Sequence, residues 1–173
     1  TAANTAYGIG SVINITVGFS EAVVVDTSSG TPTLQLETGN TDRYAVYSSG
    51  SGSSTLTFQY TVQDGDSSTD LDQLSSSSLA LNGGTINDAA GNAAILTLAA
   101  PGDSGSLGAN ADIIIKTTQP AITDVTSTTA DGSYGIEHVI NLTIGFSAAV
   151  IVDTSSGTPT LQLATGNTDR YAV

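Results

Sequence analysis

The residues of this sequence that are best suited to chemistry are aspartates gathered in short polar segments. Asp64 and Asp66 flank a glycine, and Asp70 and Asp72 follow close behind. Carboxylates on short side chains in turns are ligands that Ca²⁺ prefers, and such close carboxylates repel one another unless a cation or water separates them. The spacing is not that of an EF-hand, which needs alternate ligand positions and a closing Glu. The pattern leaves two interpretations of this loop open, a merely solvated acidic loop and a calcium site.

Two further groups of oxygen-bearing side chains extend the calcium prediction. Asp88 and Asn92 bracket a turn that contains Gly91, although Asx residues and glycine also form such turns without metal. Acidic residues also flank Pro120, where they would meet if consecutive domains stacked end to end. Calcium is therefore the one candidate cofactor. The candidate ligands are Asp64, Asp66, Asp70, Asp72, Asp88, Asn92, Asp112, Asp124 and Asp131.

The charge balance argues against several classes of partner. The chain carries 16 Asp and Glu against 3 Lys and Arg, for a net charge of −13. Nucleic acid and anionic membranes repel such a surface. No apolar run approaches the roughly 18 to 20 residues of a membrane span, so no membrane insertion is expected. The chain has no cysteine, which excludes a disulfide framework and a Cys-ligated metal centre.

An internal repeat organises the elements that must position these residues. Residues 7–46 and 134–173 align without gaps at an offset of 134 − 7 = 127 residues, and only seven of the 40 positions differ. A period of this length matches a whole small domain and is too long for a solenoid or propeller unit. We therefore expect a piece of a longer tandem array, or a domain whose missing strands come from a neighbouring molecule.

Alternation of apolar and polar residues indicates β-strands throughout the chain. In residues 13–19 and 56–62 every second residue is apolar, and only residues 72–81 are expected to hold a short helical turn. Gly, Asn, Asp and Ser separate the strands at intervals typical of sandwich domains. The predicted fold class is all-β, an immunoglobulin-like antiparallel β-sandwich in tandem repeats. Further predicted strands cover residues 22–25, 33–37, 43–47, 94–98 and 113–115.

The repeat and the strand pattern together predict the domain boundaries. Residues 1–116 form one immunoglobulin-like repeat that lacks its first strand. Residues 117–120, Thr-Thr-Gln-Pro, form a short linker that proline stiffens and keeps out of any ladder. Residues 121–173 form the N-terminal part of the next repeat. Short stiff linkers between sandwiches are typical of a rod.

The distribution of titratable residues argues against catalysis. His138 is the one histidine, and Ser11 occupies its place in the other copy. Glu21 and Glu37 both become alanine in the second copy, so neither position needs an acid. The chain has no Trp, and 5% of its residues are aromatic, which weakens a sugar-stacking cleft. We expect no enzymatic activity.

Three segments carry a resemblance to a known family: YGIGSVINITVGFSEAV, GGTINDAAGN and SLGANADIIIKTTQPAITDVTSTTADGSYG. They resemble the long repeated immunoglobulin-like modules of giant bacterial cell-surface proteins and calcium-dependent adhesins. The resemblance implies an extender that holds an adhesive domain away from the cell and is stiffened by calcium at loops and linkers. Lys116 stands at a linker-side position that is often acidic in the family, and Ser11 and His138 fill a place often held by aspartate. These departures weaken the transfer of calcium sites near the linker.

The leading hypothesis is a non-enzymatic, extracellular structural repeat, a stalk of a large adhesin or fibre on the bacterial cell surface. Its expected partners are neighbouring repeats of the same chain or identical chains. One alternative is a self-assembling filament subunit that strands of a neighbouring molecule complete. Another is a carbohydrate- or ice-binding module, suggested by threonine-rich strands around Thr33 and Thr57.

Overall fold

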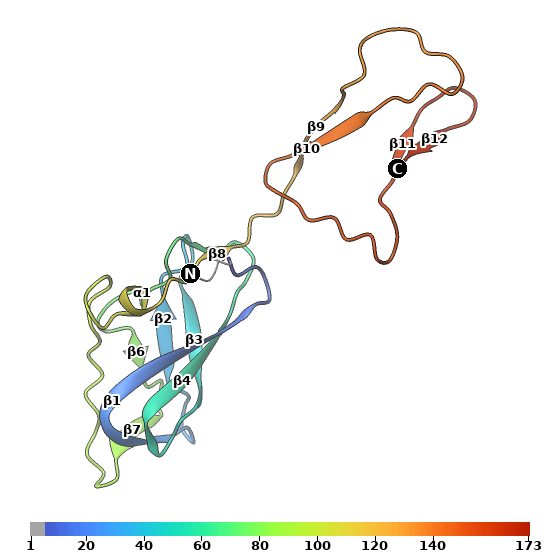
Figure 1. Ribbon diagram of the computed structural model, residues 1–173. Helices are drawn as coiled ribbons and strands as arrows, with labels where there is room; N and C mark the ends of the chain where they lie inside the picture. The colour runs from blue at the N-terminus through green and yellow to red at the C-terminus, as the bar shows by residue number, and fades with distance from the viewer. Residues whose placement is uncertain (1–5) are drawn as a thin grey trace. The chain divides into compact units, whose positions relative to one another are not determined.

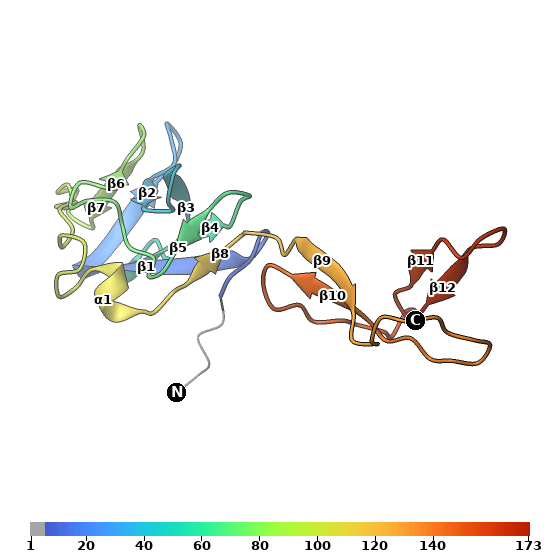
Figure 2. The ribbon, with the colours of Figure 1, turned by 90° about the horizontal axis from the view of Figure 1, so that it is seen from above.

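The computed structural model of the chain describes residues 6–173 and divides into two compact units. Unit 1 is Thr1–Thr118, described from residue 6, and unit 2 is Gln119–Val173. The division falls inside the stretch expected to be a linker. The regular secondary structure of both units consists mainly of antiparallel strands, seen from two directions in Figures 1 and 2. The all-β prediction is confirmed, while the immunoglobulin-like topology stays a prediction.

The main element of unit 1 is a six-stranded antiparallel sheet with the strand order β6-β2-β3-β4-β1-β7. A separate two-residue ladder joins β5 to β8. Among the described residues of unit 1, no second large sheet faces the first, and loops cover the core. The strands of unit 1 are β1 (Val12–Asp26), β2 (Thr33–Leu36), β3 (Arg43–Ser49), β4 (Ser53–Thr61), β5 (Ser67–Ser68), β6 (Leu79–Ala80), β7 (Thr85–Asp88) and β8 (Ile115–Lys116).

Strand β1 is 15 residues long and joins two strands that were expected to be separate. Its first half pairs with β4 from Val12 to Gly18, and its last residues pair with β7 from Val23 to Asp26. The register shifts between Gly18 and Val23. Such an irregularity bends a strand, and Figure 1 shows β1 curling at this end of the sheet.

The core of unit 1 lies on the apolar face of the two alternating strands. Ile13 pairs with Tyr60 and Ile15 with Phe58 across β1 and β4, and all four side chains are buried. The ring of Tyr47 packs edge-on against Phe58, with 5.9 Å between the ring centroids. The predicted alternation of residues 13–19 and 56–62 is therefore confirmed for the inward-facing residues of both strands.

Two predicted elements of unit 1 are wrong. Residues 94–98 are not a strand, because no neighbouring strand forms a ladder along them. Their backbone makes two separate bonds instead: the Ala94 amide donates to the Ile86 carbonyl, and the Leu98 amide donates to the Ser76 carbonyl. Residues 72–81 hold no helix, because their backbone pairs with β2. The one helical turn of the described chain is α1 (Leu107–Asn110), capped by the buried hydroxyl of Ser106.

Unit 2 contains two strand pairs formed by the repeated sequence and the segment before it. Strand β9 (Ile122–Ser127) pairs with β10 (Leu142–Phe146), and β11 (Leu161–Leu163) pairs with β12 (Arg170–Ala172). The β11–β12 hairpin has the same register as β2–β3, because each of its residue pairs lies 127 positions after a pair of the first hairpin. In the described residues, no helix is long and apolar enough to cross a membrane.

Candidate functional site

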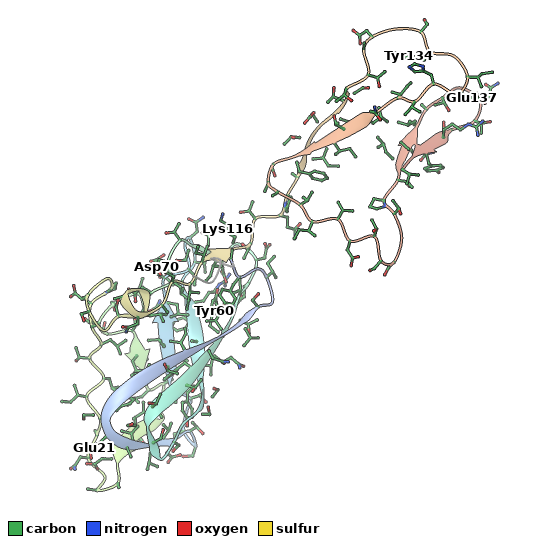
Figure 3. All side chains as sticks on the ribbon, viewed as in Figure 1. Glu21, Tyr60, Asp70, Lys116, Tyr134 and Glu137 are labelled. Atoms are coloured by element: carbon green, nitrogen blue, oxygen red, sulfur yellow. The ribbon has the colours of Figure 1, made fainter. Side chains whose placement is uncertain are left out.

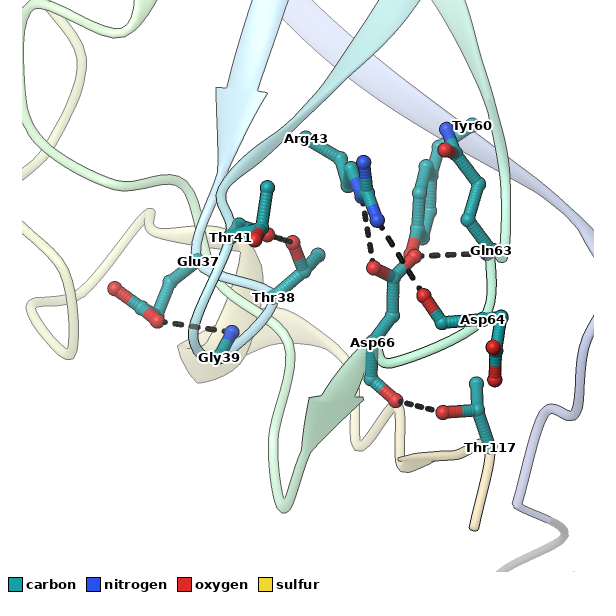
Figure 4. Close-up of polar contacts among 10 residues, drawn as sticks. All are labelled: Glu37, Thr38, Gly39, Thr41, Arg43, Tyr60, Gln63, Asp64, Asp66 and Thr117. Atoms are coloured by element: carbon teal, nitrogen blue, oxygen red, sulfur yellow. Dashed lines mark hydrogen bonds and ion pairs between the residues drawn. The ribbon is translucent and has the colours of Figure 1, made fainter. Parts of the chain in front are cut away.

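The best-connected acidic residue of unit 1 is Asp66, whose side chain is only 1% exposed. Its Oδ1 atom lies 2.8 Å from Arg43 Nε, in an ion pair between the loop after β4 and the start of β3. Its Oδ2 atom accepts hydrogen bonds from the Tyr60 hydroxyl at 2.5 Å and the Gln63 amide at 2.8 Å (Figure 4). The Thr117 hydroxyl donates to its backbone carbonyl at 2.7 Å. Asp66 therefore fastens two strands and the end of unit 1 together.

The protonation states of this cluster follow from burial and pairing. Burial alone would raise the pKa of Asp66, but the hydrogen bonds from Tyr60 and Arg43 outweigh burial and lower this pKa below its ordinary value. Burial, and then the hydrogen bond to Asp66, raises the pKa of Tyr60 well above its ordinary value. At neutral pH Asp66 is a carboxylate and Tyr60 a phenol. Both oxygens of Asp66 already have protein donors.

Asp72 holds a second loop in place through hydrogen bonds that its carboxylate accepts from backbone amides. Its Oδ1 atom accepts from the Gln73 amide and its Oδ2 atom from the Gly102 amide, both at 2.9 Å. Burial raises the pKa of Asp72, but the amides of Gly102 and Gly108 outweigh burial and lower it. The carboxylate thus ties residues 102–108 to the segment that follows β5.

The two other acids of this loop remain exposed. The side chain of Asp64 points to solvent, and its carbonyl accepts a long bond of 3.5 Å from Arg43 Nη2. Asp70 is exposed at the end of unit 1 that carries α1 (Figure 3). A Cβ on Gly108 would lie 3.3 Å from Asp70 Oδ2 and 3.0 Å from Asp72 Oδ2, so both carboxylates approach α1. The four acids that the sequence groups together therefore have different roles.

Asp88 and Asn92 form a closed turn after β7. Asp88 Oδ1 accepts from the amides of Ala90 and Asn92 at 2.8 Å, and Oδ2 accepts from Asn92 Nδ2 at 2.7 Å. The side-chain bond from Asn92 and the backbone bonds of the turn lower the pKa of Asp88. Here the metal-free Asx turn engages both carboxylate oxygens of Asp88.

The remaining predicted calcium ligands are exposed. Asp112 lies in unit 1, and Asp124 and Asp131 lie in unit 2. In residues 6–173, no three or more His, Cys, Asp or Glu side chains gather closely enough to hold a metal ion. Since Asp66, Asp72 and Asp88 are engaged by protein donors, they do not fit a calcium site in this arrangement. The calcium prediction rests on exposed carboxylates such as Asp64 and Asp70.

A feature that the acidic motifs do not indicate is an open edge of β1. The Ser11 carbonyl accepts from the Val62 amide, next to the β1–β4 ladder. Alternate residues of a strand point their backbone groups to opposite edges, so the odd-numbered residues 13, 15 and 17 face β4. The even-numbered residues 14, 16 and 18 face the other edge, where β7 begins to pair only at Val23. Among residues 6–173 no strand pairs with residues 14–20 on this side, which we call the open edge.

Two adjoining cavities run along the open edge of β1. One of about 570 Å³ lies between residues 14–18 and residues 97–113. The other, of about 440 Å³, lies between residues 17–21 and residues 92–98. Glu21, one of its lining residues, lies at the end of unit 1 where β1 bends toward β7 (Figure 3). Apolar side chains on their walls include Val17, Leu98 and Ile113. A groove thus separates β1 from the extended but unpaired segment 94–98.

Comparisons with family models, with curated proteins and with solved structures each found no match to this chain. Its functional interpretation therefore depends on the repeat, the fold and the sites described above. The groove was not predicted, because it depends on how residues 92–113 pack against β1.

Proposed function

We propose that this chain is a non-enzymatic, extracellular structural repeat of a large bacterial surface protein, acting as a stalk that spans distance. The observation that supports this best is the shared register of β2–β3 and β11–β12. Leu34 pairs with Ala45 in unit 1, and Leu161 pairs with Ala172, 127 residues later, in unit 2. A chain that builds the same hairpin from the same sequence twice is suited to making an array.

The charge of the chain suits an extended array. With a net charge of −13 from 16 acidic and 3 basic residues, neighbouring arrays repel one another and stay in solution. The contacts of the buried Asp66 and the partly buried Asp72 hold loops within unit 1, which makes the repeat more rigid. Calcium at exposed carboxylates would reduce their mutual repulsion and would stiffen the array further.

The stalk proposal is tested by measuring how length depends on repeat number. Polypeptides with one, two and four complete repeats of 127 residues would be compared by small-angle X-ray scattering. A stalk requires the maximum dimension to rise by a constant increment for each added repeat. A globular arrangement would instead increase it with roughly the cube root of mass, and that result would overturn the proposal.

One observation favours the second candidate function, a filament subunit completed by strands of neighbouring molecules. The open edge of β1 offers unpaired backbone groups beside a groove, and adding a strand to such an edge is a common mode of protein recognition.

A further inference from the structure

A segment on the N-terminal side of unit 1 lies beside its last strand. Tyr7 forms a parallel bridge with Ile115 of β8. The Tyr7 amide donates to the Ile114 carbonyl at 2.8 Å, and the Lys116 amide donates to the Tyr7 carbonyl at 3.0 Å. The segment that leads into β1 and the strand that leads out of unit 1 are therefore bonded directly to each other.

The parallel direction decides how tension acts on these two bonds. When the chain is pulled from both sides of unit 1, Tyr7 is drawn toward lower residue numbers and β8 toward higher ones. Because both segments run in the same direction, they must slide past each other along one axis, and both bonds are strained at once. Two antiparallel neighbours pulled apart at one end lose their bonds one after another instead. The bridge is thus oriented to resist tension.

Further contacts hold β8 in unit 1. Strand β8 also pairs with β5, and its Ile115 side chain is only 1% exposed. Just before the strand, the Leu71 amide donates to the Ile113 carbonyl at 2.8 Å. Just after it, the Thr117 hydroxyl donates to the Asp66 carbonyl at 2.7 Å. Sliding of β8 would therefore break contacts on both sides of the bridge and uncover a core residue.

The segment that contains Tyr7 is fixed to the main sheet. The Gly10 amide donates to the Val62 carbonyl, and the Val62 amide donates to the Ser11 carbonyl, both at 2.9 Å. Ser11 directly precedes β1, which pairs with β4 and β7. Tension on the segment before Tyr7 consequently meets the bridge first and the six-stranded sheet after it.

The anchored region extends to Thr117, the first residue of the predicted linker. Its side chain is only 8% exposed. The residue that accepts its hydrogen bond, Asp66, is itself held by the ion pair with Arg43 and by the Tyr60 hydroxyl (Figure 4). The last contact of unit 1 before the exposed Thr118 therefore reaches the most highly connected buried group of the unit.

From these contacts we propose that Tyr7 and residues 113–117 form a tensile clamp, which keeps unit 1 folded when the chain is pulled from its two sides. The clamp lets a repeat withstand tension as well as span distance, and this role in an array rests on the stalk proposal. The resistance of unit 1 itself depends only on its own contacts. Scattering tests the stalk and pulling tests the clamp, so each proposal can fail while the other stands.

Pulling on the two sides of the clamp tests the proposal directly. The chain has no cysteine, so two introduced cysteines define where force is applied. Ala6→Cys and Thr118→Cys replace exposed residues on either side of the clamp and leave unit 2 outside the pulled segment. Optical tweezers at constant force then measure the lifetime of folded unit 1 in the 173-residue chain. This lifetime reports the rate of forced unfolding.

Two substitutions each remove one bond of the clamp. Tyr7→Pro removes the amide that donates to Ile114, and Thr117→Val removes the hydroxyl that donates to Asp66. Each should shorten the lifetime about fivefold, the factor that one hydrogen bond of ordinary strength supplies. If neither substitution shortens the lifetime, the proposal is overturned. Should Tyr7→Pro fail to fold, as judged by circular dichroism, Thr117→Val alone decides the test.

Matched controls separate the clamp from general stability. Tyr7→Ala removes the same ring as Tyr7→Pro but keeps both backbone bonds of the bridge, and it should keep the lifetime of the original chain. Thr38→Val removes a buried hydroxyl outside the clamp, which donates to the Thr41 carbonyl at the same 2.7 Å as in Thr117. It should lower the thermal midpoint as Thr117→Val does but leave the lifetime under force unchanged. Equal shortening by Thr38→Val and Thr117→Val would overturn the clamp.

Discussion

Asp124 and Gly145 lie so close across the β9–β10 ladder that a Cβ on the glycine would stand 1.9 Å from the carboxylate oxygen. Gly145→Val should therefore displace Asp124 and loosen the ladder, so that the amides of β10 that bond β9 exchange faster with solvent. Gly18→Val, at the equivalent position of unit 1, should change the unfolding free energy by no more than about 0.5 kcal/mol. Amide exchange and urea unfolding measure the two effects, and equal destabilisation by both substitutions would contradict the structural difference.

The ion pair of Asp66 with Arg43 should be important for the stability of unit 1. Asp66→Asn removes the charge between Arg43 and the buried Tyr60 hydroxyl, and we expect a loss of about 3 kcal/mol in the free energy of unfolding. Asp64→Asn, two residues earlier and exposed, should cost less than about 0.5 kcal/mol. Urea unfolding monitored by tyrosine fluorescence compares the two variants. Similar values for both would show that Asp66 is not an anchor.

The same cluster predicts how stability depends on pH. The pKa values of Asp66 and Asp72 are lowered by folding, so their contribution is complete above the unfolded value of about 3.9 and is lost as pH falls through the folded values. The pKa of Tyr60 is raised by folding, so its contribution is complete below about pH 10 and is lost as pH rises further. Thermal midpoints should be level between about pH 5 and pH 9 and should fall on both sides.

Two substitutions separate the acid and alkaline limbs of this pH profile. Asp66→Asn should make the acid limb shallower, because one of the lowered pKa values is removed. Tyr60→Phe should make the alkaline limb shallower, while Asp66 keeps its bonds to Arg43 and Gln63. If the thermal midpoints of both variants fell with pH as steeply as those of the original chain, Asp66 and Tyr60 would not be the groups that set the two limbs of the profile.

Any effect of calcium should depend on exposed carboxylates. Asp66 already accepts bonds at both oxygens, so Asp66→Asn should lower the thermal midpoint equally in calcium and in chelator. A calcium-dependent rise in the midpoint should disappear in the double variant Asp64→Asn, Asp70→Asn. A calcium effect that survives this double variant but disappears in Asp66→Asn would contradict the arrangement of the loop.

The sequence predicts best what local pattern decides. Alternation of apolar residues located the paired halves of β1 and β4, whose side chains at Ile15 and Phe58 meet in the core. Residues 94–98 are rich in apolar residues but form no strand, because their few backbone bonds, such as that from the Ala94 amide to the Ile86 carbonyl, do not continue into a ladder. The single turn α1 was missed, since four residues capped by Ser106 give no helical period.

The roles of the acidic residues depend on contacts that are distant in sequence. Asp66 lies 23 residues after Arg43 and 51 before Thr117, so its partners cannot be read from the Asp-Gly-Asp motif. The motif correctly indicates a group of turn-forming carboxylates. Which of them are buried anchors and which remain exposed is decided by the packing of β3, β4 and the segment after β8.

The open edge of β1 is tested most directly by amide hydrogen exchange at four consecutive residues, Ile15 to Gly18, in the full chain. Ile15 and Val17 direct their N–H groups to β4, so these amides should be protected. Thr16 and Gly18 direct theirs to the open edge, and at concentrations where the chain is monomeric these amides should exchange rapidly. Protection of all four amides in the monomer would mean that another strand already occupies the edge, and would contradict the account.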